Sequence, residues 1–306
     1  MFYSTFESVF TLFVLIVLGY YLRKKNVFDG DITRGMIQLL LHYTLPAMIF
    51  VSMLQSNSKD MLNQSIEMFV LSVIAYVFFG IAALVFTFVL KAPEEDKGVY
   101  RFCFLFSNVG FMGYPVIEAV LGEKGVFYAA IFNIPFNFLA FSLGVLLLTK
   151  GKSEGQLFSW KILISPPLVA TFIGFIFFIT GFTLPEFILK PIDLIGSITT
   201  PLSMITIGSL LAVLPVRDIA KEWRLFVATV IRLLLIPFTL WLILRPWFSG
   251  VSLYIPIIVS AMPAAANAPI LSEKYGGKGS LASQFVFVST LFSLITIPIW
   301  SYLLLK

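Results

Sequence analysis

Apolar stretches of about 20 residues recur along the whole chain, and this pattern restricts the possible folds more than any other feature. A helix of that length crosses the hydrocarbon core of a bilayer and satisfies its own backbone hydrogen bonds there. The chain is 59% hydrophobic and 12% charged, whereas a soluble domain carries roughly 25% charged residues. The sequence therefore predicts an all-α integral membrane protein without a soluble domain.

Ten membrane spans are predicted, joined by short and mostly polar connections. The predicted spans cover residues 3–22, 32–54, 66–90, 99–121, 125–149, 161–181, 191–214, 223–244, 252–273 and 280–304. The first is expected to be a retained span, because no basic segment or cleavage site typical of a signal peptide accompanies it.

The distribution of Lys and Arg predicts the orientation. Fifteen of the 21 lie near the connections after odd-numbered spans, five near the others, and Arg232 lies inside a span. Positive residues favour the cytoplasmic side, so both termini are expected outside the cytoplasm, in a multi-pass protein of the cell membrane. The net charge of +5 is thus explained by topology, and no nucleic-acid partner is expected.

Residues 1–150 and 156–306 are predicted to be copies of one five-span unit. Pro115 and Pro269 are 154 residues apart, and the Gly-rich connections 122–125 and 276–279 match at the same shift. Because five is odd, the second copy is inverted in the membrane, as in many secondary transporters. Chance similarity between apolar sequences is the alternative, and the agreement of proline and glycine positions argues against it.

The fourth and ninth predicted spans contain helix-breaking residues, in the stretches SNVGFMGYP (107–115) and AMPAAANAP (261–269). Proline removes a backbone donor and glycine favours helix weakly, so a break near 108–115 is expected. Pro115 and Pro269 would each begin a second half-helix, with free N–H groups and a positive helix end at mid-depth. Two such ends facing one cavity favour a small anion.

Asparagines near both breaks supply uncharged donors for a carboxylate. Asn133 and Asn137 lie one turn apart around Pro135, and either face the same cavity or make an interhelical hydrogen bond. Simple kinks in two membrane helices are the alternative for both breaks. The predicted substrate site comprises Asn108, Gly110, Gly113, Pro115, Asn133, Asn137, Asn267 and Pro269.

Few charged residues fall inside the spans. Arg232, near the middle of the eighth, either balances the charge of the substrate or pairs with Glu118. Glu118 or Glu273 could take a proton or cation during transport, although Glu273, beside Lys274, is expected at the interface. His42 is better explained by a structural polar contact than by titration.

Motifs for catalysis were not found. The chain has no phosphate-binding glycine loop and no HExxH motif, and one His and one Cys do not make a metal cluster or a catalytic triad. No enzyme activity, cofactor or metal is therefore expected.

The stretch NVGFMGYP (108–115) with Gly122 and Gly125, PAAAN (263–267) and LPA (45–47) resembles the auxin efflux carrier family. That family includes bacterial malate-permease-like proteins and plant PIN-type auxin exporters, and the resemblance covers the whole chain. It implies a 5+5 inverted repeat with crossing broken helices four and nine, similar to bile-acid symporters and sodium/proton antiporters. It also places Asn108, Pro115, Asn267 and Pro269 at the substrate site.

The resemblance further implies two domains and a dimer. Spans one, two, six and seven would form a scaffold and the homodimer surface, and spans three to five and eight to ten a moving transport domain. The long cytoplasmic loop of the plant exporters is replaced by residues 151–155, so a small carboxylate is expected rather than auxin.

The sequence thus predicts a secondary transporter for a small organic anion, such as malate or an auxin-like acid, that works by an elevator-like or rocking motion. Its expected partners are the carboxylate, membrane lipid and a proton or sodium ion. The first alternative is a cation-coupled symporter or antiporter of related fold, using Glu118 or Glu273. The second is a membrane receptor that does not transport.

Overall fold

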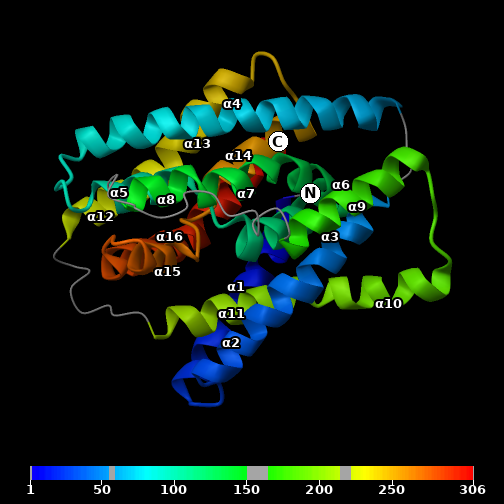
Figure 1. The fold of residues 1–306 in the computed structure, drawn as a ribbon, viewed down its shortest axis with the longest axis horizontal. Helices are drawn as coiled ribbons and strands as arrows, with labels where there is room; N and C mark the ends of the chain where they lie inside the picture. The colour runs from blue at the N-terminus through cyan, green and yellow to red at the C-terminus, as the bar shows by residue number, and fades with distance from the viewer. Residues whose placement is uncertain (1, 55–58, 150–164, 214–221, 306) are drawn as a thin grey trace. The chain divides into compact units, whose positions relative to one another are not determined.

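The computed structural model describes residues 2–54, 59–149, 165–213 and 222–305, and these residues are almost entirely helical (Figure 1). Within these ranges there is one isolated β-bridge and no sheet. The all-α prediction is therefore confirmed. The predicted connection at 151–155 and the first residues of the sixth predicted span, 161–164, lie outside the described ranges.

The described residues form many helical elements, several of them much shorter than a predicted span. The first half contains α1 (Phe2–Lys24), α2 (Gly30–Leu39), η1 (Leu40–Thr44), α3 (Leu45–Met53), α4 (Lys59–Val89), α5 (Lys97–Leu105), η2 (Val109–Gly113), α6 (Tyr114–Phe132), α7 (Ile134–Phe141) and α8 (Leu143–Leu148). The second half contains α9 (Pro166–Thr180), α10 (Glu186–Ser197), α11 (Thr199–Leu211), α12 (Trp223–Val230), η5 (Ile231–Leu235), α13 (Ile236–Leu244), α14 (Val251–Ala261), α15 (Ala268–Lys274) and α16 (Gly279–Leu305).

Five helical stretches in the described ranges are long and apolar enough to cross a membrane. They are Gly30–Met53, Asp60–Val89, Glu186–Leu211, Trp223–Leu244 and Gly279–Leu304. The bent pair Val109–Phe132 and Ile134–Leu148 makes a sixth if it is one span. A multi-pass membrane protein is thus confirmed, whereas the ten-span inverted repeat stays a prediction.

The surface of α4 shows why a membrane is needed. Its exposed large apolar side chains are Ile66, Phe69, Val70, Val73, Ile74, Val77, Ile81, Leu84, Val85, Phe88 and Val89. A soluble monomer rarely exposes a contiguous apolar patch of this kind. Hydrocarbon solvates such a surface without cost, so lipid is the natural neighbour of this helix.

The chain divides into two compact units that do not coincide with its two halves. Unit 1 contains 1–70, 110–134 and 163–213, and unit 2 contains 71–109, 135–162 and 214–306. The chain therefore passes between the units several times. The predicted scaffold and transport domains stay predictions.

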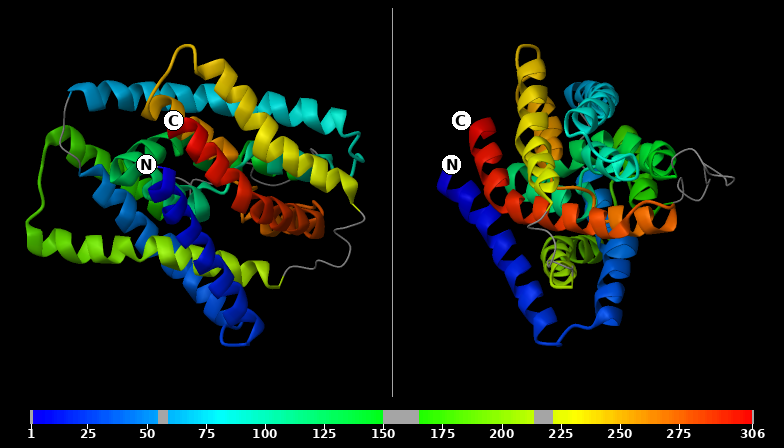
Figure 2. Two further views of the ribbon diagram at one scale, coloured as in Figure 1. Left: turned by 180° about the vertical axis from the view of Figure 1, so that it is seen from behind. Right: turned by 90° about the vertical axis from the view of Figure 1, so that its left-hand side faces the viewer.

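In unit 1, α1 packs along α11, and α3 packs against α9 and α10. α1 and α2 run to a shared turn, seen in blue in Figure 2. In unit 2, α16 contacts α5, α12, α14 and α15. Aromatic rings fill the junction of α5 and α16, where Phe285 meets Phe104 edge to face with ring centroids 5.8 Å apart.

Three wide helical turns precede prolines. η1, η2 and η5 are five-residue π-helical turns, and Pro46, Pro115 and Pro237 each occupy the second residue of the α-helix that follows. Proline has no N–H for the carbonyl four residues earlier, and its ring clashes with that carbonyl. A π-turn widens the backbone at this place, and the helix continues in one line, as α12, η5 and α13 do in Figure 2.

One of the carbonyls freed in this way has a clear substitute donor. Leu233 lies four residues before Pro237, and its carbonyl oxygen accepts a hydrogen bond of 2.9 Å from the indole N–H of Trp300 on α16. Neighbouring helices commonly satisfy the backbone groups that a membrane-embedded proline releases. This bond fixes η5 against α16.

The contact of α1 with α11 depends on two glycines. A Cβ at Gly19 would overlap the main chain of Ile205, and a Cβ at Gly208 would overlap that of Ile16. Small residues of this kind let membrane helices approach closely enough for backbone packing. We expect Gly208→Ala to lower the free energy of unfolding by about 1–3 kcal/mol because the two helices must separate.

The control for this prediction is Gly80→Ala in α4, where an added Cβ meets nothing within 4 Å. Alanine favours helix over glycine by about 1 kcal/mol, so this variant should be as stable as the parent or more stable. Thermal midpoints of the purified proteins in detergent measure both effects. Equal midpoints for Gly208→Ala and the parent would contradict the close approach.

Candidate functional site

Two unwound segments pair with each other inside unit 2. α5 ends at Leu105 and helix resumes at Val109, while α14 ends at Ala261 and α15 begins at Ala268. The N–H of Asn108 donates to the carbonyl of Pro263 at 2.9 Å, and the N–H of Ala265 donates to the carbonyl of Phe106 at 3.1 Å. These two bonds flank the isolated antiparallel bridge between Ser107 and Ala264.

The pairing solves a problem that each segment has alone. Phe106, Asn108 and Ala264 are buried, and each unpaired buried backbone group costs roughly 2–7 kcal/mol. The N–H of Ala264 finds a further partner in the hydroxyl of Ser289 on α16, at 3.2 Å. Interrupted backbone is therefore tolerated here because it is enclosed by protein.

The first interruption precedes the residues that were expected to cause it. Gly110 and Gly113 belong to η2, and Pro115 is the second residue of α6. The break falls at 106–108, so Pro115 follows a π-turn and does not begin the half-helix itself. In the second segment α15 begins at Ala268, with Asn267 at the N-cap position and Pro269 as the second helical residue.

The predicted asparagines differ in their surroundings. The Asn108 side chain is buried, with 4% of the residue exposed. The Oδ1 atom of Asn267 is buried and has no hydrogen-bond partner among the described residues. Its side chain also makes no capping bond to α15. Asn267 therefore holds an unused acceptor next to the paired segments.

Asn133 and Asn137 do not share one continuous helix. Asn133 is the turn residue between α6 and α7, is buried, and hydrogen-bonds with the side chain of Tyr114. Asn137 lies in α7 and is partly buried. The Tyr114 contact supports a structural role for Asn133, and its predicted role in binding stays untested.

The predicted site residues are distributed over the two units. Asn108, Asn137, Asn267 and Pro269 belong to unit 2, whereas Gly110, Gly113, Pro115 and Asn133 belong to unit 1. The structure brings Asn108 close to the 263–265 segment through backbone bonds. That all eight residues form one substrate site stays a prediction.

Arg232 lies in η5 and is completely buried. One terminal nitrogen, Nη2, donates to the hydroxyl of Ser107 in the first unwound segment. Nε and Nη1 have no hydrogen-bond partner among the described residues. A buried guanidinium thus lies beside the paired segments.

Glu118 and Glu273 occupy different environments. Glu118 is partly buried in α6 and accepts a 2.6 Å hydrogen bond from the hydroxyl of Thr200 on α11, within unit 1. Glu273 is exposed near the end of α15, and its expected place at the membrane interface stays a prediction. His42, in η1, is exposed, and its Nδ1 lies 3.0 Å from the carbonyl oxygen of Gln38, a local contact of the kind predicted.

Sequence patterns did not identify Ser289 or Thr200 as partners of site residues. A hydroxyl residue in an apolar helix gives no sign of which distant neighbour it contacts. Ser107 could have been noticed, because it directly precedes Asn108 in the interrupted stretch.

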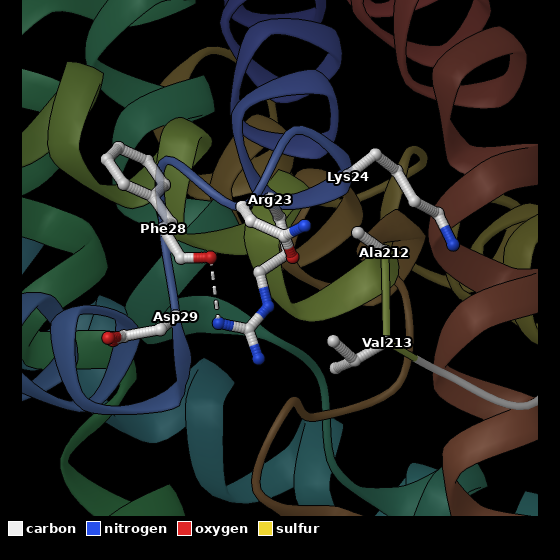
Figure 3. Close-up of a pocket in the computed structure, with 7 residues that line it drawn as sticks. Arg23, Lys24, Phe28, Asp29, Ala212 and Val213 are labelled. Carbon is white, nitrogen blue, oxygen red and sulfur yellow. Dashed lines mark hydrogen bonds between the residues drawn. The ribbon is translucent and has the colours of Figure 1, made fainter.

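Two surface cavities lie elsewhere in unit 1. One, of about 320 Å³, is lined by Arg23, Lys24, Asn26, Phe28, Asp29, Ala212 and Val213. Figure 3 shows Arg23 reaching across it to donate to the Phe28 carbonyl, at 3.1 Å. The other, of about 440 Å³, is lined by Val51, Leu54, Glu123, Glu186, Leu189, Lys190 and Asp193. Neither includes a residue of the predicted substrate site.

Two glycines that the sequence aligns at a shift of 154 residues both have a positive φ. Gly122 has φ +69° inside α6 and divides it into two helical pieces, and Gly276, 154 residues later, has φ +84°. Left-handed φ values favour glycine. A positive φ at both positions is the feature that the two Gly-rich connections share.

The second of these connections is tied to the start of α5. Lys278 lies 2.6 Å from Glu95 and 2.9 Å from Asp96. The hydrogen bonds to Glu95 and then Asp96 raise the pKa of Lys278 above its usual value. The paired segments are thus linked at the ends of their helices as well.

Membrane helices interrupted by buried, unwound backbone occur in many secondary transporters. A family model described as "Membrane transport protein" matches residues 4–301. The chain belongs to this family, which is the auxin efflux carrier family that the sequence resembled.

Curated relatives match along nearly their whole length. An uncharacterized transporter of Methanocaldococcus jannaschii is 25% identical over 98% of this chain and 99% of its own. The uncharacterized transporter YfdV of Escherichia coli K12 is 23% identical over 95% of each chain. A Rhizobium meliloti protein, described as a proposed malonate transporter, is 21% identical over 97% of this chain and 94% of its own.

The Lys278 contacts give a prediction for stability. The side chain is 46% exposed, so Lys278→Met should cost about 1 kcal/mol or less. Because the folded-state pKa is raised, the contribution is complete below the unfolded pKa of about 10.4 and is lost as pH rises through the folded value. Thermal midpoints of parent and variant should therefore differ at neutral pH and converge at strongly alkaline pH.

Lys124 is the matched control, since it aligns with Lys278 at the shift of 154 residues and makes no ion pair with a described residue. Lys124→Met should leave the midpoint unchanged across the same pH range. A difference between Lys278→Met and the parent that does not depend on pH would contradict the ionic explanation.

Proposed function

We propose that the protein is a secondary transporter that moves a small carboxylate across the cytoplasmic membrane by alternating access. In this proposal ten spans form a 5+5 inverted repeat, and 106–108 and 262–267 are the breaks in spans four and nine. Both termini are extracytoplasmic. The scaffold spans form a homodimer surface, and the remaining spans carry the substrate in an elevator-like or rocking motion.

The observation that carries the proposal is the pairing of the two unwound segments. Asn108 and Asn267 lie at their ends. The side-chain NH2 group of each can donate to a carboxylate. Corresponding interruptions in two halves of a membrane protein are the best sequence indication of a transporter binding site. The matching left-handed glycines Gly122 and Gly276 support the repeat.

The substrate class is inferred from the donors available. The side-chain NH2 groups of Asn108 and Asn267 and the buried guanidinium of Arg232 are donors, and donors next to a positive charge favour an anion. The name of the Rhizobium meliloti relative suggests malonate as the first compound to test, followed by malate and indole-3-acetate as an auxin-like acid.

The first experiment compares Asn267→Ala with the parent. The Asn267 side chain makes no capping bond and its Oδ1 has no partner, so its loss should leave folding and insertion intact. We expect the variant, and Asn108→Ala, to lose the rise in thermal midpoint that a bound carboxylate gives the parent. Uptake of labelled malonate or malate into proteoliposomes should fall in parallel.

The matched control is Asn63→Ala, at an exposed position of α4. It should retain the midpoint shift and the uptake of the parent. Undiminished ligand binding in both Asn267→Ala and Asn108→Ala would remove these residues from the site. A parent protein that neither binds nor moves any tested carboxylate would remove the function.

A second candidate is cation-coupled transport through Glu118. Its support is the partly buried carboxylate that accepts a hydrogen bond from Thr200. If Glu118 carries a proton, Glu118→Gln should abolish uptake driven by a pH gradient and retain exchange of labelled for unlabelled substrate. Glu273→Gln, at the exposed repeat counterpart, is the comparison.

Uptake by the parent that does not depend on pH or sodium would argue against this second candidate. So would a Glu118→Gln variant that accumulates substrate as well as the parent does.

A further inference from the structure

Arg232 presents an electrostatic problem that the described contacts do not solve. It is completely buried in η5, near the middle of the eighth predicted span. An arginine at the centre of a membrane helix costs at least roughly 2.5–3.5 kcal/mol on insertion scales, and such residues face the bundle interior, a partner or a cavity. Arg232 therefore needs a compensating group.

The neighbours of Arg232 in unit 2 supply only part of that compensation. Nη2 donates to the Ser107 hydroxyl, and Nε and Nη1 have no hydrogen-bond partner among the described residues. The other side chains that interact with its charge are Cys103 and Tyr76, neither of which is a carboxylate. Within the described part of unit 2, the charge has no ion-pair partner.

The charge of Arg232 lies next to the predicted substrate site, because its hydrogen-bond partner Ser107 is part of the first unwound segment. Ser107 directly precedes Asn108 and pairs with Ala264 in the antiparallel bridge. η5 is also fixed, because the Trp300 indole donates to the Leu233 carbonyl within the same π-turn. Turns of this kind are frequent at functional sites.

We propose that Arg232 is the fixed cation that binds a carboxylate group of the transported anion, and that Ser107 positions it beside the paired segments. This inference rests on the proposed function and names the group that would select a charged substrate. One carboxylate matches the requirement in charge, because it carries a single negative charge and Arg232 a single positive one. Its oxygens can also accept a hydrogen bond from Nε or from Nη1, the donor nitrogens that have no partner among the described residues.

The decisive experiment supplies an internal carboxylate. Ser107→Asp places an acid next to Nη2, so the buried charge becomes paired and the variant should fold. Ser107→Asn has nearly the same size and no charge. We expect Ser107→Asp to bind malonate roughly tenfold or more weakly than Ser107→Asn, because the internal acid competes for Arg232.

Binding is measured by the malonate concentration needed to raise the thermal midpoint and by isothermal titration calorimetry in lipid nanodiscs. Malonamide, the uncharged diamide of similar shape, is the ligand control and should not stabilise the parent. Equal malonate affinity in Ser107→Asp and Ser107→Asn would overturn the assignment. Equal stabilisation of the parent by malonamide and malonate would also overturn it.

Substitution of Arg232 itself is the second arm. Arg232→Gln should lose malonate binding, and Arg232→Lys, which keeps the charge, should bind more tightly than Arg232→Gln does. If Arg232→Gln binds malonate as the parent does, Arg232 is not the carboxylate partner, and the proposed function is unaffected. If the parent responds to none of malonate, malate and indole-3-acetate, both the function and this inference fail.

Discussion

The need to pair every backbone amide inside a membrane controls the arrangement of unit 2. Two helices stop within buried protein, and water is not available to the groups they release. The two unwound segments lie side by side, and the backbone N–H groups of Asn108 and Ala265 each donate to a carbonyl of the opposite segment. Two further hydrogen bonds join this pairing to its neighbours. Ser289 on α16 accepts from the Ala264 N–H, and Arg232 in η5 donates to the hydroxyl of Ser107.

Composition and helix length were sufficient to predict the class of fold. Helices such as α4 expose large apolar side chains, which lipid solvates and water does not. Long apolar stretches in the sequence therefore indicate such helices directly. The family resemblance was also predicted and confirmed, because it depends on short stretches such as 108–115. Both conclusions use local sequence information.

The exact position of the first break could not be predicted. Gly110, Gly113 and Pro115 are the strongest helix breakers in the stretch, yet helix already resumes at Val109. A π-turn accommodates the proline, and the end of α5 is decided by the partner segment at 263–265. Contacts between residues far apart in the chain, such as Ser107 with Ala264 and Arg232 with Ser107, leave no periodic pattern in the sequence.

The antiparallel bridge has a consequence for how the protein can move. Separating 106–108 from 263–265 would leave two amides and two carbonyls without partners in an apolar interior, at a cost of several kcal/mol. The two segments are therefore expected to move together as one rigid unit. A conformational change that moves 106–108 also moves 263–265. The pair can be displaced as a whole, but the two segments cannot act as a hinge between them.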